Sequence, residues 1–292
     1  MTCYAQKSRT QKETPMHQNT AYDNPTYYYD ADYPSQTLGK YPENFDEFTK
    51  AQGIAFDVPR YVEMAREITG AILEVCCGTG RVAIPLAREG FRVTGVDISE
   101  GSLSQFAEKL QAQGNEVSER VKIVQQDATR LSLENRDYGM AILAFNSLLC
   151  IPDFTSQKTV LKRVGEHLKP GGLLVLDIRN PLVMRTFGGD PVPRALYTRR
   201  NPHNGNAFTR FALWDAIDEN HRIRMHGWYD EVAEDGVVRR RHYSIHMRPI
   251  FRFEIEMMLE EAGFQLVGIE GGARKEAYTA QSEYMWIRAR KR

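Results

Sequence analysis

The chain has 292 residues, 42% of them hydrophobic, and is therefore long enough to bury one full core with additions. It carries 38 basic and 38 acidic residues, so its formal net charge is zero, which disfavours a polymeric polyanion such as nucleic acid as a partner. No apolar run reaches membrane-spanning length, and the polar N-terminus has no signal-like apolar core. We therefore expect a cytoplasmic protein without membrane contact.

The N-terminal segment divides into two parts. Residues 1–24 are polar and poor in aliphatic side chains, a composition typical of mobile chain. The next stretch is rich in tyrosine, with Tyr28 and Tyr29 at its centre. These rings either pack N-terminal helices onto the core or line a pocket. We expect residues 1–55 to form a flexible segment and lid, and residues 56–292 to form the main domain.

Residues 71–99 predict a strand, a glycine turn, a helix and a second strand. Gly78 and Gly80 lie at the turn, where the missing Cβ atoms permit positive φ and let a ligand approach the backbone beside a helix N-terminus. Asp97 ends the second strand, where a carboxylate can accept both hydroxyls of a ribose. The unit therefore predicts a site for a ligand that contains adenosine.

Two kinds of adenosine ligand fit the glycine turn. The run from Gly78 to Ala83 matches the G-x-G-x-x-G/A pattern of dinucleotide-binding proteins, so an NAD-dependent oxidoreductase is one alternative. Glu74, however, lies at the end of the first strand, where its carboxylate would repel a pyrophosphate and attract an ammonium group. This favours S-adenosylmethionine, which carries an ammonium and a sulfonium.

Strands and helices alternate along the next part of the chain, and polar residues follow the strand ends. Asp127 and Ala128 follow the third strand and Asn146 the fourth, while Lys169–Gly172 is a helix-stop signal before the fifth. The expected strands are Ala71–Cys76, Phe91–Val96, Val121–Gln126, Met140–Phe145 and Leu173–Ile178, and the expected helices are Gly80–Glu89 and Thr155–Leu168.

The region of about 195–248 changes to a period of two, which predicts three antiparallel strands inserted after the fifth core strand. Such an insert could cover a pocket or pair with a second copy of the chain to make a homodimer, because exposed strand edges pair readily. The chain then returns to the core with a helix at Phe251–Ala262 and strands at Phe264–Ile269 and Tyr284–Ala289.

Over residues 70–180 the chain resembles the class I S-adenosylmethionine-dependent methyltransferases. The matching segments, in order, are LEVCCGTGR, VTGVDIS, QQDA, AFNSL and HLKPGGLLVLDI. The resemblance implies a Rossmann-like α/β sheet with helices on both faces, plus the small antiparallel insert. It also implies a methyl transfer to a small-molecule acceptor, most simply to a nitrogen in specialised metabolism, with S-adenosylhomocysteine as the product.

The resemblance also implies individual roles for residues at the strand ends. Glu74, Gly78 and Gly80 would line the methionine part of the cofactor, with Cys76 in a position where the family often has glycine. Tyrosine-rich segments ahead of the first strand fold over the cofactor in similar enzymes, which would place Tyr28 or Tyr29 at the pocket. The remaining cofactor residues would be Asp97 at the ribose, Ile98 on an adenine face, Asp127 and Ala128 at the adenine edge, and Asn146 near the methyl group.

Each of these positions also has a structural explanation. The glycines can serve the turn alone, and Asp97 and Asp127 can cap the helix or loop that follows each of them. Their gathering at one edge of a sheet is the argument for a site, because open α/β sheets bind ligands there. A binding protein that holds the cofactor without turnover is the alternative from outside enzymology.

The acceptor side is less defined by the sequence. O-methylation is the second enzymatic alternative, and it needs a base because a hydroxyl must lose its proton. His226 and His242 on the inserted strands are the candidate bases, although histidines on such strands are most often ordinary surface residues. The candidate substrate-binding residues are Arg179 and Asn180 after the fifth strand and Trp214 and Trp228 as aromatic walls.

The four cysteines, Cys3, Cys76, Cys77 and Cys150, show no metal-binding spacing. We therefore expect reduced thiols and no metal site.

Overall fold

The computed structural model describes residues 26–33, 54–151, 153–184, 188–201 and 203–292. Residues 1–24, which the sequence predicts to be mobile, and most of the predicted lid lie outside the described residues, as does Cys3.

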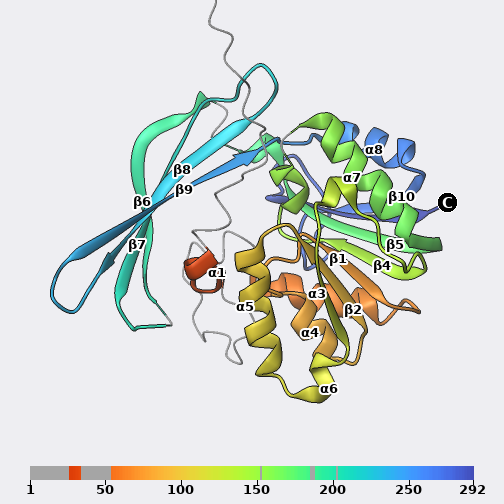
Figure 1. Cartoon of the computed structure of the whole chain (residues 1–292). Coiled ribbons are helices and arrows are strands. Elements are labelled where there is room, and N and C mark those ends of the chain that lie inside the picture. Colours follow the sequence, from red (N-terminus) through yellow and green to blue (C-terminus); the bar gives the residue numbers. More distant parts are fainter. Residues whose placement is uncertain (1–25, 34–53, 152, 185–187, 202) are drawn as a thin grey trace, which may run out of the picture.

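A seven-stranded sheet forms the core, in the order β10-β11-β5-β4-β1-β2-β3 (Figure 1). The pairs among β1 to β5 are parallel, whereas β11 runs antiparallel to both β5 and β10. The strands are β1 Ile72–Val75, β2 Val93–Asp97, β3 Val121–Gln125, β4 Tyr138–Leu143, β5 Leu168–Arg179, β10 Phe264–Glu270 and β11 Tyr284–Lys291.

Helices cover both faces of this sheet, as the sequence predicts (Figure 1). Alternate side chains of β1, β4 and β5 enter two separate apolar clusters, which is why these strands are hydrophobic almost without a break. One cluster includes α7 Phe154–His167 and α8 Arg252–Glu261, and the other includes α3 Ile54–Ala65, α4 Ala83–Arg88 and α5 Glu100–Gln111. Short elements complete the core: α6 Asn115–Ser118, η2 Ala128–Arg130, η3 Ser147–Cys150 and η4 Pro181–Val183.

Two boundaries differ from the sequence prediction. The helix expected from Gly80 begins only at Ala83, because the turn occupies the residues between them. The expected stop at Lys169–Gly172 is part of β5, which begins at Leu168 directly after α7. The pairing with β4 shifts register across these four residues, so the proline and two glycines form an irregularity at the start of the strand.

The insert contains four antiparallel strands: the three that the sequence predicts, and one before them that the prediction missed. The missed first strand begins at Asp190 and contains Pro191 and Pro193. Proline cannot donate to a ladder but is tolerated at a sheet edge, which is where this strand lies. The strands are β6 Asp190–Arg200, β7 Ala207–Trp214, β8 Ile223–Val232 and β9 Val238–Met247.

A short helix, α1 Thr26–Asp32, lies between the insert and the core (Figure 1). On the insert side, Tyr28 is buried and stacks on Tyr229 with a centroid distance of 4.3 Å. On the core side, Asp30 accepts a hydrogen bond from Thr79 (2.7 Å) in the glycine turn and pairs with Lys109 (2.7 Å) of α5. The helix therefore connects the insert to the edge of the sheet where the glycine turn lies.

Candidate active site

Three acidic side chains share one face of the sheet at the carboxyl ends of its strands. Glu74 on β1, Asp97 on β2 and Asp177 on β5 occupy the face covered by α3, α4 and α5. Ile72, Val93 and Val175, which lie an even number of residues before them on the same strands, belong to the cluster on that face. Side chains that alternate with them pack on the opposite face. The structure therefore brings together carboxylates that lie far apart in the sequence.

The glycine turn has the backbone conformation that a ligand-binding turn requires. Gly78 has φ +55°, and a Cβ built there would meet nothing within 4 Å, so the space above it is open. Gly80 has φ +80° and is close-packed instead, since a Cβ would lie 2.3 Å from the ring of Phe106. Cys76 has φ +61°, a left-handed conformation that favours glycine, the residue that the resemblance implies for this position.

Asp97 is held in place by two backbone amides. Gly78 N donates to one carboxylate oxygen (2.8 Å) and Ser99 N donates to the other (2.9 Å). Burial raises the pKa of this carboxyl, and these amides oppose the shift. The next residue, Ile98, keeps 52% of its side chain exposed, which is unusual for an isoleucine at the end of a buried strand. Asp97 is placed to fit a ribose, and Ile98 is placed to fit one face of an adenine.

Glu74 is almost fully buried, and one of its oxygens has no hydrogen-bond partner among the described residues. Burial raises its pKa to about 8, with Arg81 lowering it and Asp97 raising it further. A buried carboxyl without a partner costs free energy unless a donor reaches it. The ammonium group of a ligand at the open Gly78 turn would be such a donor, so these residues fit the methionine part of S-adenosylmethionine.

Asp127 caps the short helix η2 by accepting hydrogen bonds from Thr129 N and Oγ1 (2.8 Å each). Both bonds go to one carboxylate oxygen, so the structural role predicted for this residue is present and the second oxygen stays available to a ligand. Ala128 is buried beside it as the first residue of η2.

The end of β4 is an unusual turn with two consecutive left-handed residues, Phe145 (φ +51°) and Asn146 (φ +63°). Such conformations cost free energy and concentrate at functional sites. Asn146 Oδ1 accepts a hydrogen bond from Arg179 N (2.6 Å), and Phe145 N donates to Asp177 (2.7 Å). The turn is thus fixed to the end of β5, and its amide side chain is engaged there.

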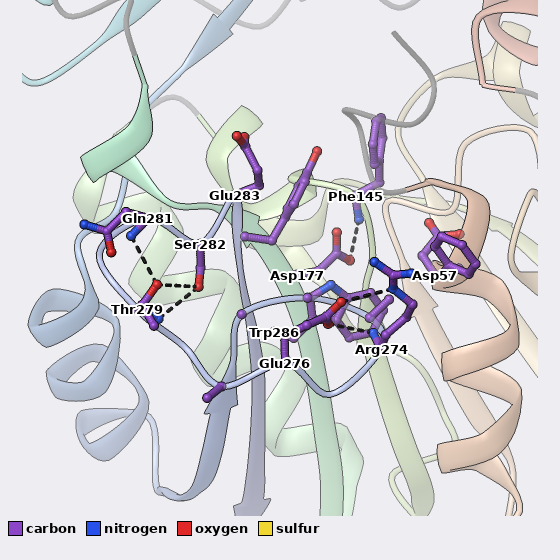
Figure 2. Close-up of a pocket in the computed structure, with 16 residues that line it drawn as sticks. Asp57, Phe145, Asp177, Arg274, Glu276, Thr279, Gln281, Ser282, Glu283 and Trp286 are labelled. Carbon is purple, nitrogen blue, oxygen red and sulfur yellow. Dashed lines mark hydrogen bonds and ion pairs between the residues drawn. The ribbon is translucent and has the colours of Figure 1, made fainter. Parts of the chain in front are cut away.

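A pocket of about 490 Å³ opens at the same sheet edge, beside β5 and β11 (Figure 2). Its walls come from the start of α3, the ends of β4 and β5, and the segment between β10 and β11. They contain four carboxylates and a single basic side chain, together with four aromatic rings. These residues are Asp57, Asp177, Glu276, Glu283, Arg274, Phe56, Phe145, Tyr284 and Trp286.

Asp177, Asp57 and Arg81 are not among the residues predicted from the sequence, although the structure groups them at this edge. Arg81 pairs with Asp57 (2.6 Å), and both side chains are buried. The Arg81 guanidinium also lies 5.3 Å from the centroid of the Phe145 ring. The sequence signal for Asp177 was an aspartate inside the apolar run of β5. A charged side chain in a strand that is buried on both faces costs free energy unless it has a partner or a function.

The two tyrosines predicted at the cofactor point in different directions. Tyr28 faces the insert and donates to Glu231 (2.7 Å), as the packing alternative predicts. Tyr29 lies beside Arg81 and Tyr33, and burial raises its pKa. Of the two, only Tyr29 lies on the side of the pocket residues.

The candidate bases His226 and His242 lie on the face of the insert that points away from α1. On β8 the side chains that face α1, such as Tyr229, alternate with those of His226 and Trp228. His226 pairs with Asp215 (2.9 Å), and the His242 ring lies 6.1 Å from that of Trp228. The structure does not bring these histidines to the carboxylates at the sheet edge.

The predicted substrate residues are also separated. Trp214 lies on the α1 side of the insert and Trp228 on the other, so they do not form one aromatic wall. Asn180 is fully buried, and its amide bonds the backbone of Ser282 (2.8 Å) and Leu182 (3.1 Å). Arg179 borders the pocket through its ion pair with Glu283 (2.7 Å).

Within the described part of the chain, no cluster of three or more metal-ligating side chains is present, and the thiols of Cys76 and Cys77 are not in disulfides. Burial raises the pKa of the Cys76 and Cys77 thiols. Among the helices that the structure describes, none is long and apolar enough to span a membrane.

Comparison with known proteins shows that the part of the chain that forms this sheet edge matches a family model. A family model described as "Methyltransferase domain" matches residues 72–172, which contain Glu74, the glycine turn, Asp97, Asp127 and Asn146. The protein is a class I methyltransferase. Its cofactor is S-adenosylmethionine, so the dinucleotide alternative falls away.

Relatives extend over most of this methyltransferase. It is 26% identical over 233 residues to YqeM of Bacillus subtilis (strain 168), whose name assigns it to the methyltransferases, and the match covers 80% of this chain and 88% of YqeM. It is 24% identical over 237 residues to the cypemycin N-terminal methyltransferase of a Streptomyces species, covering 78% of this chain and 86% of that protein.

Solved methyltransferase structures share the whole fold, including the insert region. The CcbJ methyltransferase of Streptomyces caelestis superposes with a TM-score of 0.73 at 24% identity, covering 94% of this chain and 98% of CcbJ. The S-adenosylmethionine complex of CalS10, an amino pentose methyltransferase of Micromonospora echinaspora, gives 0.64 at 19% identity, covering 90% and 96%.

Proposed function

We propose that this methyltransferase transfers the methyl group of S-adenosylmethionine to a nitrogen of a small molecule of specialised metabolism. The observation that carries the proposal is the acceptor pocket, which combines four aromatic rings with the carboxylate of Asp177, the lining carboxylate that is not ion-paired with an arginine among the described residues. Such walls attract an amine in its cationic form through charge and through the ring faces. The N-terminal amine methylated by the cypemycin enzyme and the amino sugar of CalS10 are acceptors of this kind.

In this proposal the cofactor lies across the ends of β1, β2 and β3. Glu74 and the Gly78 turn hold its ammonium group, Asp97 holds the ribose, and Ile98 covers the adenine, whose edge meets Asp127 and Ala128. The orphaned oxygen of Glu74 and the open space above Gly78 support this placement.

The bound cofactor supplies an electrophilic methyl group. The protein's own contribution is to orient the acceptor from the pocket beside Phe145 and to exclude water around it. Orientation of this kind accounts for up to about 7–11 kcal/mol in favourable intramolecular models. An amine acceptor needs only a free lone pair, whereas a hydroxyl needs a base to remove its proton. His226 and His242, the bases that the sequence predicts for a hydroxyl acceptor, lie on the far face of the insert, so the O-methylation alternative lacks the bases it was based on.

A paired extract assay tests the proposal. Extract of cells that express the protein is divided, and one half is treated with an amine-acylating reagent that leaves most alcohols intact. Each half then receives enzyme and methyl-labelled S-adenosylmethionine. We expect a labelled small molecule in the untreated half and its loss after acylation. A labelled product that survives acylation would replace nitrogen with oxygen or carbon as the acceptor atom.

A further inference from the structure

We propose that Asp177 is the residue that takes the proton from the acceptor's ammonium group in the pocket. The inference rests on the proposed nitrogen acceptor and adds a catalytic residue to it. An ammonium binds well to an acidic pocket, but it has no lone pair with which to attack a methyl group. A site that attracts the cation therefore also needs a group that can accept its proton.

The carboxylate of Asp177 is oriented by donors from two other elements. Phe145 N, at the end of β4, donates to Oδ1 (2.7 Å), and the hydroxyl of Tyr61 on α3 donates to the same oxygen. The hydrogen bonds that the described residues donate to Asp177 both go to Oδ1 and none goes to the second oxygen, Oδ2, and Asp177 lines the pocket (Figure 2). Two bonds on one oxygen fix the carboxylate while the other oxygen stays free to accept a proton.

The surroundings of Asp177 make it a suitable base. Its pKa is raised to about 6: burial is the main cause and the nearby carboxylate of Asp57 adds to it, while the Tyr61 hydroxyl, the Phe145 amide and Arg81 oppose the shift. Tyr284 lines the pocket from β11, and the guanidinium of Arg179 lies over its ring. Near neutral pH the carboxyl is ionised, and its basicity exceeds that of an exposed aspartate.

The proton transfer requires only the acceptor's ammonium group and the carboxylate of Asp177. One N–H bond of the ammonium breaks, and its electron pair stays on nitrogen as the lone pair. The proton forms an O–H bond with Oδ2 of Asp177, so a cation and an anion become a neutral amine and a neutral carboxylic acid. The proton then passes to solvent water at the pocket.

Asp177→Asn tests the assignment, because asparagine keeps an oxygen for the Phe145 amide and the Tyr61 hydroxyl but cannot accept the proton. With the amine acceptor found in the extract assay, we expect kcat to fall about 10²–10⁴-fold near neutral pH. Activity should recover at high pH, where the free amine forms without a base. Affinity for S-adenosylhomocysteine should stay close to that of the unmodified protein.

Tyr61→Phe separates catalysis from a purely structural role. Loss of the Tyr61 hydroxyl removes a hydrogen bond that lowers the pKa of Asp177. The acid limb of the pH profile should therefore move to higher pH while the fold is kept. If Tyr61 and Asp177 served only to stabilise the fold, Tyr61→Phe would lower activity without moving the acid limb of the pH profile.

A binding measurement gives a readout that needs no turnover. Benzylamine serves as the probe and benzyl alcohol as its neutral match, each titrated into the complex with S-adenosylhomocysteine. We expect the benzylammonium ion to bind at least about fivefold more weakly to Asp177→Asn, and also more weakly as Asp177 is protonated at acid pH, with no such change for benzyl alcohol. The inference is overturned if both probes respond alike and the pH profile of Asp177→Asn matches that of the unmodified protein. Methylation that survives amine acylation would instead overturn the nitrogen proposal itself.

Discussion

Glu74 shows how a single residue links the site to the stability of the fold. Its pKa is raised by burial from 4.5 to about 8, so between these values the folded protein keeps a proton that the unfolded chain has lost. The free energy of unfolding therefore falls as pH rises through this window. A buried, partly unsatisfied acid destabilises the fold, and in the proposed cofactor site the ligand's ammonium group would supply the missing partner.

We expect Glu74→Gln to remove this dependence on pH. Glutamine keeps an oxygen for the Ala83 amide but has no proton to lose, so the variant should gain stability relative to the unmodified protein as pH rises. Urea denaturation at about pH 5 and about pH 8 measures the two slopes. Glu119→Gln, at an exposed glutamate, is the matched control. Equal slopes for Glu74→Gln and the unmodified protein would show that Glu74 does not titrate in this range.

Asp97 gives the second prediction at this scale. Asp97→Ala removes the carboxylate that we propose as the acceptor of the ribose hydroxyls, and it frees the Gly78 amide in the turn. We expect the affinity for S-adenosylmethionine to fall by about 1–3 kcal/mol in calorimetry. Asp137→Ala changes an exposed aspartate at the opposite end of the core sheet and should leave affinity unchanged. Unaltered binding to Asp97→Ala would exclude this residue from the cofactor site.

Helix α1 is the element that joins the two sheets. Its Asp32 is buried against the insert, where it pairs with Arg210 (3.1 Å) and accepts hydrogen bonds from the hydroxyls of Tyr197 and Tyr229. Burial raises the pKa of Asp32, and Arg210 opposes the shift. Two residues earlier, Asp30 contacts the glycine turn, so any displacement of this helix from the insert also reaches the cofactor edge.

Breaking the Asp32 pair should therefore be costly. Arg210→Met leaves a buried carboxyl without its cation, and we expect a loss of about 3–5 kcal/mol in the free energy of unfolding. The double variant Arg210→Met with Asp32→Asn removes the uncompensated charge and should recover part of the loss. Urea denaturation of the two variants makes the comparison. A double variant no more stable than the single one would show that the ion pair is not what stabilises this contact.

At the scale of the whole molecule, both free edges of the insert carry residues that oppose pairing. The edge strand β6 contains Pro191 and Pro193, and the other edge, β9, carries three consecutive arginines from Arg239. Prolines and positive charges are common means of protecting sheet edges from association. A homodimer through the insert stays a prediction from the sequence, and these edge residues weigh against it.

We expect the chain to sediment as a monomer at micromolar concentration, because neither edge offers an uninterrupted ladder to a second copy. Sedimentation equilibrium measures the mass directly. A dimer that dissociates when Val238, exposed on β9, is changed to lysine would contradict this expectation.

The sequence alone determined the core sheet, its two covered faces and the cofactor edge. Buried parallel strands are marked by continuous apolar runs, and ligand-binding turns by glycines, so local composition carries that information. Strand ends at Glu74, Asp97 and Asn146 are local features of this kind. The edge strand β6 was missed because its prolines are rare in strands and fit only at an edge, which local sequence does not reveal.

Only the tertiary structure decided the acceptor side. Tyr61 meets Asp177 and Asp57 meets Arg81 across long stretches of chain, and the pocket takes its walls from α3, β4, β5 and the segment before β11. The face on which each insert side chain points likewise depends on strand register, which turned His226 and Trp228 away from α1 and Tyr229 toward it. Register and long-range packing are set by the burial of whole elements against one another, and no local pattern in the sequence encodes them.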